Sequence, residues 1–416
     1  MLSRQGMTGS NILAVKSHNL SALLLTLLLR QPISRVALAE CTGLSTTTVT
    51  NLVNELLSQG IVVEDGSDER GDRRGAGRRR TALRLVPGAR HVAAVHIDVG
   101  VVRVAMSDLH AGLQRIYSLS HPLTASAHEV LSATARLLEQ ALAERPHGAG
   151  EVLGIGVGAS GLVDPARGVN LLAPNLGWRD VHICDFFRTR FGLPVCVDNN
   201  VRAMALGEAL FGAGRDARVL AFVYDRIGVG AGLVVDGHVF RGSGGGAGEI
   251  GHVTILPEGG ERCGCGNSGC LETLVSEPAI VRLAERLAAA EPDGLLARHL
   301  ARGQGSAIER IFAAARAGDS AVRSLLEERG RYMGIALATL VNIFNPELIL
   351  LGGILAQGSD LFLPAIEATV RQRAFADLGR KVRIGVAPVG DQVGLVGAAA
   401  LALDAFFYRR AEYADL

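Results

Sequence analysis

One short segment restricts the fold of this chain more than any other, because a histidine and three cysteines fall within residues 252–270. Cys263, Cys265 and Cys270 form a C-x-C-x4-C pattern, and His252 lies eleven residues before it. Three thiolates and one imidazole are a complete tetrahedral ligand set for a structural zinc ion. Glycines between the cysteines allow the backbone to fold closely around an ion. We therefore predict a zinc-bound loop with no ligand position open for chemistry; a disulfide is the alternative.

Composition favours a protein of two or three domains. The chain has 416 residues, of which 48% are apolar and 20% are charged, and this is enough for more than one core. The net charge is +1, so no field of the whole chain directs it to nucleic acid or membrane. The hydrophobic segment 20–29 has only ten residues, about half of what a membrane-spanning helix requires. We expect a cytoplasmic protein without a membrane partner, and the six cysteines fit a reducing compartment.

Residues 36–57 have the pattern of a helix-turn-helix. Val36, Ala37 and Leu38 are expected to line a short first helix, and Gly43 lies where the tight turn requires a positive φ. Apolar residues at helical spacing from 49 to 57 give the second helix one buried stripe. Its outer face carries short hydrogen-bonding side chains, which suit a helix in the major groove of DNA. The side chains of this region predicted to contact DNA are Ser45, Thr46, Thr47, Thr48, Thr50 and Asn51.

A basic hairpin is expected to follow. Segments 61–64 and 81–86 alternate like paired strands, and the loop between them is rich in glycine and arginine. From 70 to 84 there are seven Arg and one acidic residue. Such a loop beside a helix-turn-helix is typical of a wing that contacts phosphates or the minor groove, here through Arg78, Arg79 and Arg80. A solvated linker is the alternative. We assign residues 1–88 to a winged helix-turn-helix DNA-binding domain.

Three motifs in the rest of the chain resemble the ROK family, which comprises repressors and sugar kinases. They are GAGEIGH at 246–252, CGCGNSGCLE at 263–272 and NPELILLGGIL at 345–355. The resemblance covers roughly 90–405, and the winged domain ahead of it is similar to the regulatory branch. It implies an α/β fold with two lobes, actin-like as in sugar kinases and Hsp70, around a sugar cleft. We expect a ROK domain at 89–416, with a small lobe of 89–200 plus the C-terminal helix and a large lobe of 201–390.

The resemblance also implies which residues bind a sugar. His252 would serve both ligands, with one ring nitrogen toward the metal and the other toward the sugar. The adjacent amides at 199 and 200 would hold hydroxyls, and Asn175 is a weaker candidate. The full predicted set is Asn175, Asn199, Asn200, Glu249, His252 and Glu272.

The same resemblance identifies departures from the kinases. Family kinases carry Asn-Asp where this chain has Asn199 and Asn200, and that Asp is the base that deprotonates the sugar hydroxyl. An amide cannot accept the proton at neutral pH, so a contribution of roughly 10²- to 10⁴-fold in rate is lost. Asp198 would be a poor substitute, because in an extended segment it lies about 7 Å from position 200. We therefore expect no enzyme.

The phosphate turns of the kinases are altered as well. Val101 and Val102 replace a glycine and a threonine of the first turn, and Val229 replaces the threonine of the second. These changes remove the close backbone approach and the hydroxyls that bind phosphate. Ser160 lies where the family commonly has proline. We expect no ATP as cofactor.

Together these patterns predict a sugar-responsive DNA-binding regulator of the ROK type that acts as a repressor. Its ligand would bind in the degenerate kinase cleft and change the spacing of two winged domains over a palindromic operator, as a homodimer or tetramer. One alternative is an active ATP-dependent sugar kinase with a DNA-binding domain. Another is a DNA-binding protein whose second domain only dimerises.

Overall fold

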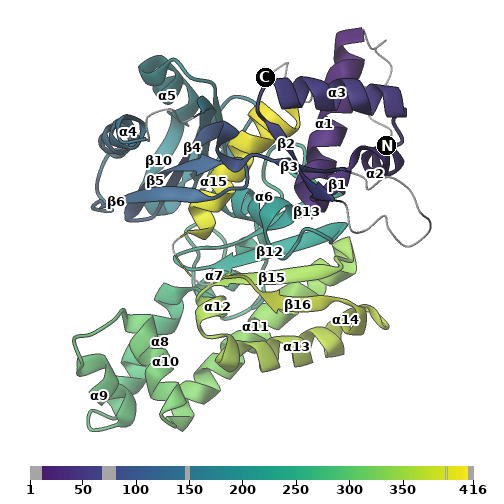
Figure 1. The fold of residues 1–416 in the computed structure, drawn as a ribbon. Coiled ribbons are helices and arrows are strands. Elements are labelled where there is room, and N and C mark those ends of the chain that lie inside the picture. Colours follow the sequence, from purple (N-terminus) through teal and green to yellow (C-terminus); the bar gives the residue numbers. More distant parts are fainter. Residues whose placement is uncertain (1–11, 68–80, 146–149, 389, 391, 411–416) are drawn as a thin grey trace.

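The computed structural model describes residues 12–67, 81–145, 150–388, 390 and 392–410. Figure 1 shows two stacked α/β lobes, with a small N-terminal domain beside the upper lobe and the last helix (yellow) running through the upper lobe toward that domain. This arrangement confirms the predicted fold class, a winged helix-turn-helix followed by a two-lobed α/β domain. Among the described residues, no helix combines the length and the apolar character that crossing a membrane requires.

The N-terminal domain has three helices and a three-stranded antiparallel sheet in the order β1-β3-β2. Gly43 adopts φ 70° between α2 and α3, which confirms the predicted tight turn. Val36 lies in α2 as predicted but is 38% exposed, whereas Leu38 is fully buried. The predicted hairpin is formed by β2 and β3. The elements are α1 (Ile12–Arg30), β1 (Ile33–Ser34), α2 (Arg35–Thr42), α3 (Thr46–Ser58), β2 (Val62–Ser67) and β3 (Thr81–Leu85).

The first lobe is built on a five-stranded sheet in the order β11-β7-β4-β5-β6. β4, β5 and β6 are antiparallel neighbours, whereas β4, β7 and β11 run parallel. A small sheet, β10-β9-β8, extends beside it. The elements are β4 (Arg90–Asp98), β5 (Val101–Asp108), β6 (Leu113–Ser120), α4 (Ala127–Ala143), β7 (Glu151–Ala159), β8 (Leu162–Asp164), β9 (Val169–Ala173), β10 (Trp178–His182), α5 (Ile183–Phe191) and β11 (Val195–Asn199).

The second lobe has a five-stranded sheet in the order β14-β13-β12-β15-β16. The helices of this lobe bury one face of the sheet in the largest apolar cluster. Its strands are β12 (Val219–Asp225), β13 (Val229–Val235), β14 (His238–Val239), β15 (Leu348–Gly353) and β16 (Arg383–Val386). Its helices are α7 (Leu271–Val275), α8 (Glu277–Ala290), α9 (Leu295–Ala301), α10 (Ala307–Arg316), α11 (Ser320–Phe344), α12 (Ile354–Gln357), α13 (Ser359–Arg373) and α14 (Leu378–Lys381).

Two helices cross between the lobes. α6 (Asn200–Phe211) follows the last strand of the first sheet but packs on β12 and β13 of the second. α15 (Val393–Leu403) follows the last strand of the second sheet but packs on β4 and β7 of the first. The two helices also pack on each other, and Gly207 and Gly397 lie at their contact, where a side chain would crowd the facing helix. The lobes are therefore joined through an exchange of helices.

Candidate functional site

A cavity of about 570 Å³ lies between the two lobes. This volume falls in the range of small-molecule pockets, roughly 300–1,000 Å³. The first lobe supplies the end of β4, the β7–β8 turn and the segment after β9. The second supplies the turn after β12 and residues 252–270, called the metal loop because they include the predicted metal ligands. All residues predicted to bind a sugar line this cavity: Asn175, Asn199, Asn200, Glu249, His252 and Glu272.

The two adjacent asparagines have different local roles. Asn199 is the N-cap of α6, because its Oδ1 accepts from the backbone N–H of Val201 at 2.9 Å and of Arg202 at 3.1 Å. Its Nδ2 donates to the carbonyl of Gly161 at 2.9 Å. Asn200 is the first residue of α6 and is almost fully buried, although it still lines the cavity. Asn199 therefore has little capacity left for a ligand, and Asn200 has more.

Asp198 does not point toward the sugar position. Its carboxylate is 1% exposed and accepts from Arg202 Nε at 2.7 Å and Arg241 Nε at 2.8 Å. Arg202 also donates to the carbonyls of Val163 and Gly245. Asp198 is thus part of a buried network that joins β11, α6 and the loop before Glu249. The assumption of an extended segment from 198 to 200 is wrong, because the chain turns into α6 at position 200.

The acidic residues of the cavity come from the second lobe. Glu272 Oε2 accepts from the backbone N–H of Val229 at 3.0 Å, which fixes the carboxylate. A Cβ atom at Gly228 would lie 2.9 Å from Glu272 Oε2 and 3.6 Å from Asn175 Nδ2, so these two side chains approach one point from opposite lobes. Surrounding protein desolvates Glu249 and raises its pKa despite its exposure to the open cleft, and the nearby Glu272 adds to this. The site therefore offers hydroxyl acceptors on a partly dry surface.

The residues at the positions that correspond to the kinase phosphate turns in the sequence comparison are part of the folded core. Val101 and Val102 open β5 and are buried, and Val229 opens β13 and is also buried. Gly100 takes φ 78° in the turn before β5. Side chains at these three positions therefore pack as ordinary strand residues.

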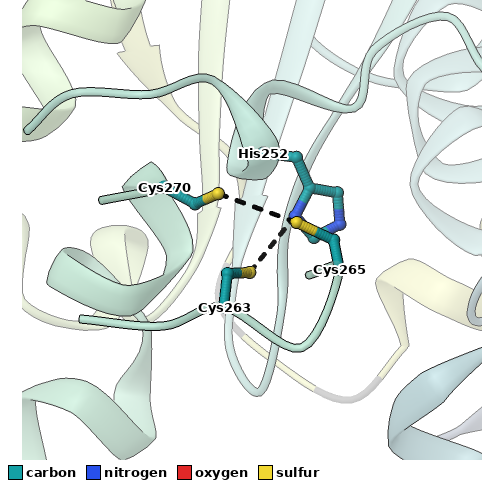
Figure 2. A group of neighbouring side chains, drawn as sticks. All are labelled: His252, Cys263, Cys265 and Cys270. Carbon is teal, nitrogen blue, oxygen red and sulfur yellow. Dashed lines mark hydrogen bonds between the residues drawn. The ribbon is translucent and has the colours of Figure 1, made fainter. Parts of the chain in front are cut away.

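The predicted metal ligands converge on one point (Figure 2). His252 comes from a 3₁₀ turn (Ile250–His252), and Cys270 is the residue before α7. Cys263 Sγ lies 3.6 Å from His252 Nδ1, and Cys265 Sγ lies 3.8 Å from Cys270 Sγ. All four ligand atoms lie within 4.8 Å of one another. All six cysteines lie in the described part of the chain and each is a free thiol, so this cluster has the donors and the spacing to hold a metal ion.

The outer face of α3 is open to solvent at Thr46, Thr47 and Asn51. Ser45 Oγ caps the helix by accepting from the N–H of Thr48 at 3.1 Å. Thr50 Oγ1 donates to the carbonyl of Thr46 at 2.8 Å. Ser45, Thr48 and Thr50 therefore have hydroxyls already engaged in local contacts. The predicted wing residues 78–80 lie outside the described residues.

The structure also reveals site contacts that the sequence patterns did not predict. Arg226, directly after β12, forms an ion pair with Asp98 at the end of β4, with Nη1 and Oδ2 2.8 Å apart. Ser160 Oγ donates to the same carboxylate at 2.9 Å. The two charged partners are 128 positions apart, so no local motif could have paired them.

Known proteins resemble this chain over nearly its whole length. A model of the ROK family matches residues 94–405, and a model of the MarR family matches residues 19–75. A xylose repressor of Caldicellulosiruptor bescii is 32% identical over 391 residues, which cover 94% of this chain and 96% of the relative.

Solved structures support the same relationship. The crystal structure of a ROK family transcriptional regulator, a homologue of the E. coli MLC protein, has a TM-score of 0.81 at 28% identity, covering 96% of this chain and 99% of that one. A ROK family glucokinase from Streptomyces griseus, in complex with glucose and AMPPNP, has a TM-score of 0.67 at 31% identity, covering 75% of this chain and 98% of that one. The family model spans most of the chain and contains both the cleft and the metal cluster, so this chain belongs to the ROK family.

Proposed function

We propose that the protein is a transcriptional repressor whose interlobe cleft binds a sugar and whose winged domain binds DNA. The observation that carries this proposal is one continuous apolar cluster. It contains the core of the winged domain together with residues of both crossing helices, α6 and α15. A ligand that alters the lobes therefore acts on elements against which the DNA-binding domain is packed.

α6 is the most direct physical link between the two sites. Asn200 begins it in the cleft, while Leu206 and Leu210 pack in the same cluster as Leu27 and Leu28 of α1. Twelve residues of helix span about 18 Å. The helix is buried along almost its whole length, so it moves as a rigid body with its neighbours.

Polar contacts also attach the winged domain to the segment after α6 and to the first lobe. Arg215, shortly after α6, donates through Nη2 to the carbonyl of Leu28 at 2.9 Å. Gln31 Nε2 lies 2.9 Å from His110 Nε2 of the first lobe. The winged domain therefore contacts the chain after α6 and the turn after β5, and relative movement of these two supports would change its orientation.

The chemistry of the cleft favours a neutral polyol as the ligand. Glu249 and Glu272 supply acceptors for hydroxyl groups, and Asn200 supplies an amide. The names of the relatives make D-xylose and D-glucose the first candidates. The amide at position 200 and the buried valines at both turns support binding without phosphoryl transfer, because position 200 has no carboxylate to accept a proton and valines stand where the kinases have a glycine and two threonines.

A zinc ion is the metal that suits the cluster best. With zinc–sulfur and zinc–nitrogen bonds of about 2.3 and 2.0–2.1 Å, a tetrahedral ion separates two sulfurs by about 3.8 Å and a sulfur and a nitrogen by about 3.6 Å. The measured separations are 3.8 Å and 3.6 Å. The ion would be structural, and it would fix the loop that carries His252 on the wall of the cleft while Nε2 of that ring serves the sugar.

On DNA, we propose that α3 enters the major groove and that residues 78–80 contact phosphates or the minor groove. The protein would act in the cytoplasm as a homodimer or tetramer on a palindromic operator. Thr46, Thr47 and Asn51 are the side chains best placed to read bases, because their side chains are exposed on one helix face.

The decisive test measures operator affinity with and without sugars. An operator is selected from random duplex DNA, and fluorescence anisotropy gives its dissociation constant in the presence of D-xylose, D-glucose and their phosphates. At least one ligand should change the affinity, and Glu249→Gln should reduce that response. Glu258→Gln, an exposed change in the same loop region outside the cavity, is the control. Unchanged affinity with every ligand would disprove regulation by sugar.

The kinase alternative has its own test. ADP release is measured with a panel of sugars for the wild type and for Asn200→Asp. Neither protein should turn over, because the variant restores only the carboxylate and not the phosphate turns. Turnover of the wild type above a heat-inactivated control would establish the kinase instead.

A further inference from the structure

Two hairpin turns face each other across the cleft. β4 ends at Asp98, and β12 ends just before Arg226. Arg226 Nη1 lies 2.8 Å from Asp98 Oδ2. Because β4 and β12 belong to different sheets, this ion pair joins the two lobes directly. Both residues line the cavity.

The carboxylate of Asp98 is held in a fixed position. It is 5% exposed, and its Oδ1 accepts from the backbone N–H of Val99 at 2.8 Å and from the hydroxyl of Ser160 at 2.9 Å. Burial alone would raise the pKa of Asp98, but the charges of His96 and Arg226 and these hydrogen bonds outweigh it and hold the pKa below its ordinary value. The partner of Arg226 is therefore an ionised, preorganised acceptor.

A further hydrogen bond connects this ion pair with the sugar position. Asn200 Nδ2 donates to Ser160 Oγ at 3.0 Å. A serine hydroxyl has a single proton, which Ser160 gives to Asp98, so it can only accept from Asn200. Asn200 thus donates to Ser160 and Ser160 donates to Asp98, which also accepts from Arg226, so an unbroken series of hydrogen bonds connects Asn200 with Arg226. Position 200 is also where α6 begins.

We propose that these four residues form an interlobe latch, in which the Asp98–Arg226 ion pair holds the lobes together and Asn200 is the input. Nδ2 of Asn200 carries two N–H groups, so a ligand hydroxyl that binds the second one and draws the amide toward the cleft lengthens its bond to Ser160. Ser160 then holds Asp98 less firmly, and the ion pair opens more often. The latch itself is a property of the ligand-free chain; only its use by an effector rests on the proposed sugar binding.

The ion pair is tested by hydrogen exchange of the ligand-free, full-length protein. Arg226→Met should speed exchange in the peptides that contain Val99 and residues 226–230 by about threefold or more, the effect of losing a partly buried pair. Asp98→Asn should have a similar effect, and the double variant should add little, because both changes remove one contact. Arg226→Lys should retain part of the protection, since it keeps the charge.

Arg218→Met is the matched control. Arg218 pairs with Asp236 at 2.7 Å within the second lobe, and both side chains are exposed. Its loss should leave exchange at both turns unchanged. If Arg226→Met changed exchange no more than Arg218→Met, the latch would be excluded.

The input is tested by changing Asn200 in two backgrounds, again without ligand. Asn200→Ala should speed exchange at residues 226–230 when Ser160 is present and should have little further effect in Ser160→Ala. Ser160→Ala alone should also speed exchange at these residues, and it leaves the first turn of α6 intact. Equal effects of Asn200→Ala in both backgrounds, or no effect of Ser160→Ala, would refute the relay. Because no sugar is used, this result is independent of whether the repressor proposal holds.

Discussion

The two five-stranded sheets have the same strand order but differ at the end of their first strand. In each sheet the first strand is central; on one side it begins a meander of two further strands with antiparallel pairing, and on the other side two strands follow with parallel pairing. In each, the helix that follows the fifth strand packs on the opposite sheet. The first strands end in Asp98 and Asp225, and both carboxylates are buried.

The neighbours of these two carboxylates differ completely. Asp98 faces the cleft and has an ion pair and two hydrogen bonds. Within the described residues, neither oxygen of Asp225 has a hydrogen-bond donor. Burial, and then the charges of Glu272 and Glu277, raise the pKa of Asp225 well above its ordinary value. The repeated topology thus places one carboxylate at the end of the first strand of each sheet. The residues around it decide whether it joins the two lobes, as Asp98 does, or destabilises the lobe in which it lies, as Asp225 does.

The largest loss of stability should follow changes in the segments that border the cleft, which differ between the two lobes. The first lobe uses the sheet β10-β9-β8, and the second uses the metal loop. Removal of the metal by a chelator, or Cys270→Ser, should cost at least about 3 kcal/mol, because structural metal binding contributes directly to folding. Calorimetry measures the loss, and hydrogen exchange should accelerate at 249–272 but not at 162–182.

Cys41→Ser is the control for this experiment, because Cys41 is an exposed thiol of α2 outside the cluster. It should leave the melting temperature and the metal content unchanged. Equal melting temperatures before and after chelation, with metal loss verified by elemental analysis, would show that the two lobes do not differ in this way.

A second test concerns a feature that both sheets share: each lies in close contact with one of the two crossing helices. A Cβ atom at Gly156 of β7 would clash with the carbonyl oxygen of Ala398 in α15. A Cβ atom at Gly232 of β13 would lie 2.5 Å from the Cβ of Ala205 in α6. Gly156→Ala and Gly232→Ala should each cost about 2–3 kcal/mol in urea unfolding, because the helices cannot move apart without losing packing.

The matched control is Gly88→Ala, since no atom lies within 4 Å of a Cβ at that position. Its effect should be within about 0.5 kcal/mol. If the variants at 156 and 232 were as mild as this control, the exchanged helices would not be tightly packed on the sheets.

Much of the fold could be predicted from the sequence because its signals are local. The metal ligands lie within 19 residues, the helix-turn-helix within 22, and the hairpin strands have their own alternation. The pairing of Asp98 with Arg226 and the exchange of α6 and α15 depend on residues far apart in the chain. No periodicity carries such information, since it arises only when the sheets stack.

The candidate site was predictable in its members but not in their roles. All six predicted sugar residues line one cavity, yet the sequence did not distinguish the cap, Asn199, from Asn200. That distinction depends on where β11 ends and α6 begins, and such boundaries are set by tertiary packing. Of the two arginines that hold Asp198, Arg202 is only four positions away, whereas Arg241 is 43 positions away and no local pattern pairs it with Asp198.

The contributions of Asp225 and Asp98 to the free energy of unfolding should depend on pH in opposite directions. The folded pKa of Asp225 is raised, so its contribution favours folding below about pH 4 and is lost as the pH rises. Asp225→Asn should remove that loss, so its free energy of unfolding should exceed that of the wild type by about 1–3 kcal/mol between pH 4 and pH 8. The folded pKa of Asp98 is lowered, so its contribution is present above about pH 4 and lost as the pH falls.

Asp98→Asn should accordingly cost about 1–2 kcal/mol at pH 7, reduced from a fully buried pair because Arg226 is partly exposed. Chemical denaturation at several pH values measures both differences. If the two variants shifted the pH profile in the same direction, the assigned environments of the two carboxylates would be wrong.

The smallest difference in stability between the two lobes should come from the first turns of α6 and α15, the two exchanged helices. α6 is capped by the side chain of Asn199, whereas Gln392, the residue before α15, makes no side-chain cap. Asn199→Ala should therefore cost about 1 kcal/mol, because the backbone N–H of Arg202 loses its acceptor and that of Val201 keeps only Asn200 Oδ1, and Asn199→Ser should recover part of it. Gln392→Ala should change stability by less than about 0.5 kcal/mol. Urea unfolding distinguishes the two, and equal costs would show that the side chain of Asn199 does not stabilise α6 as a cap.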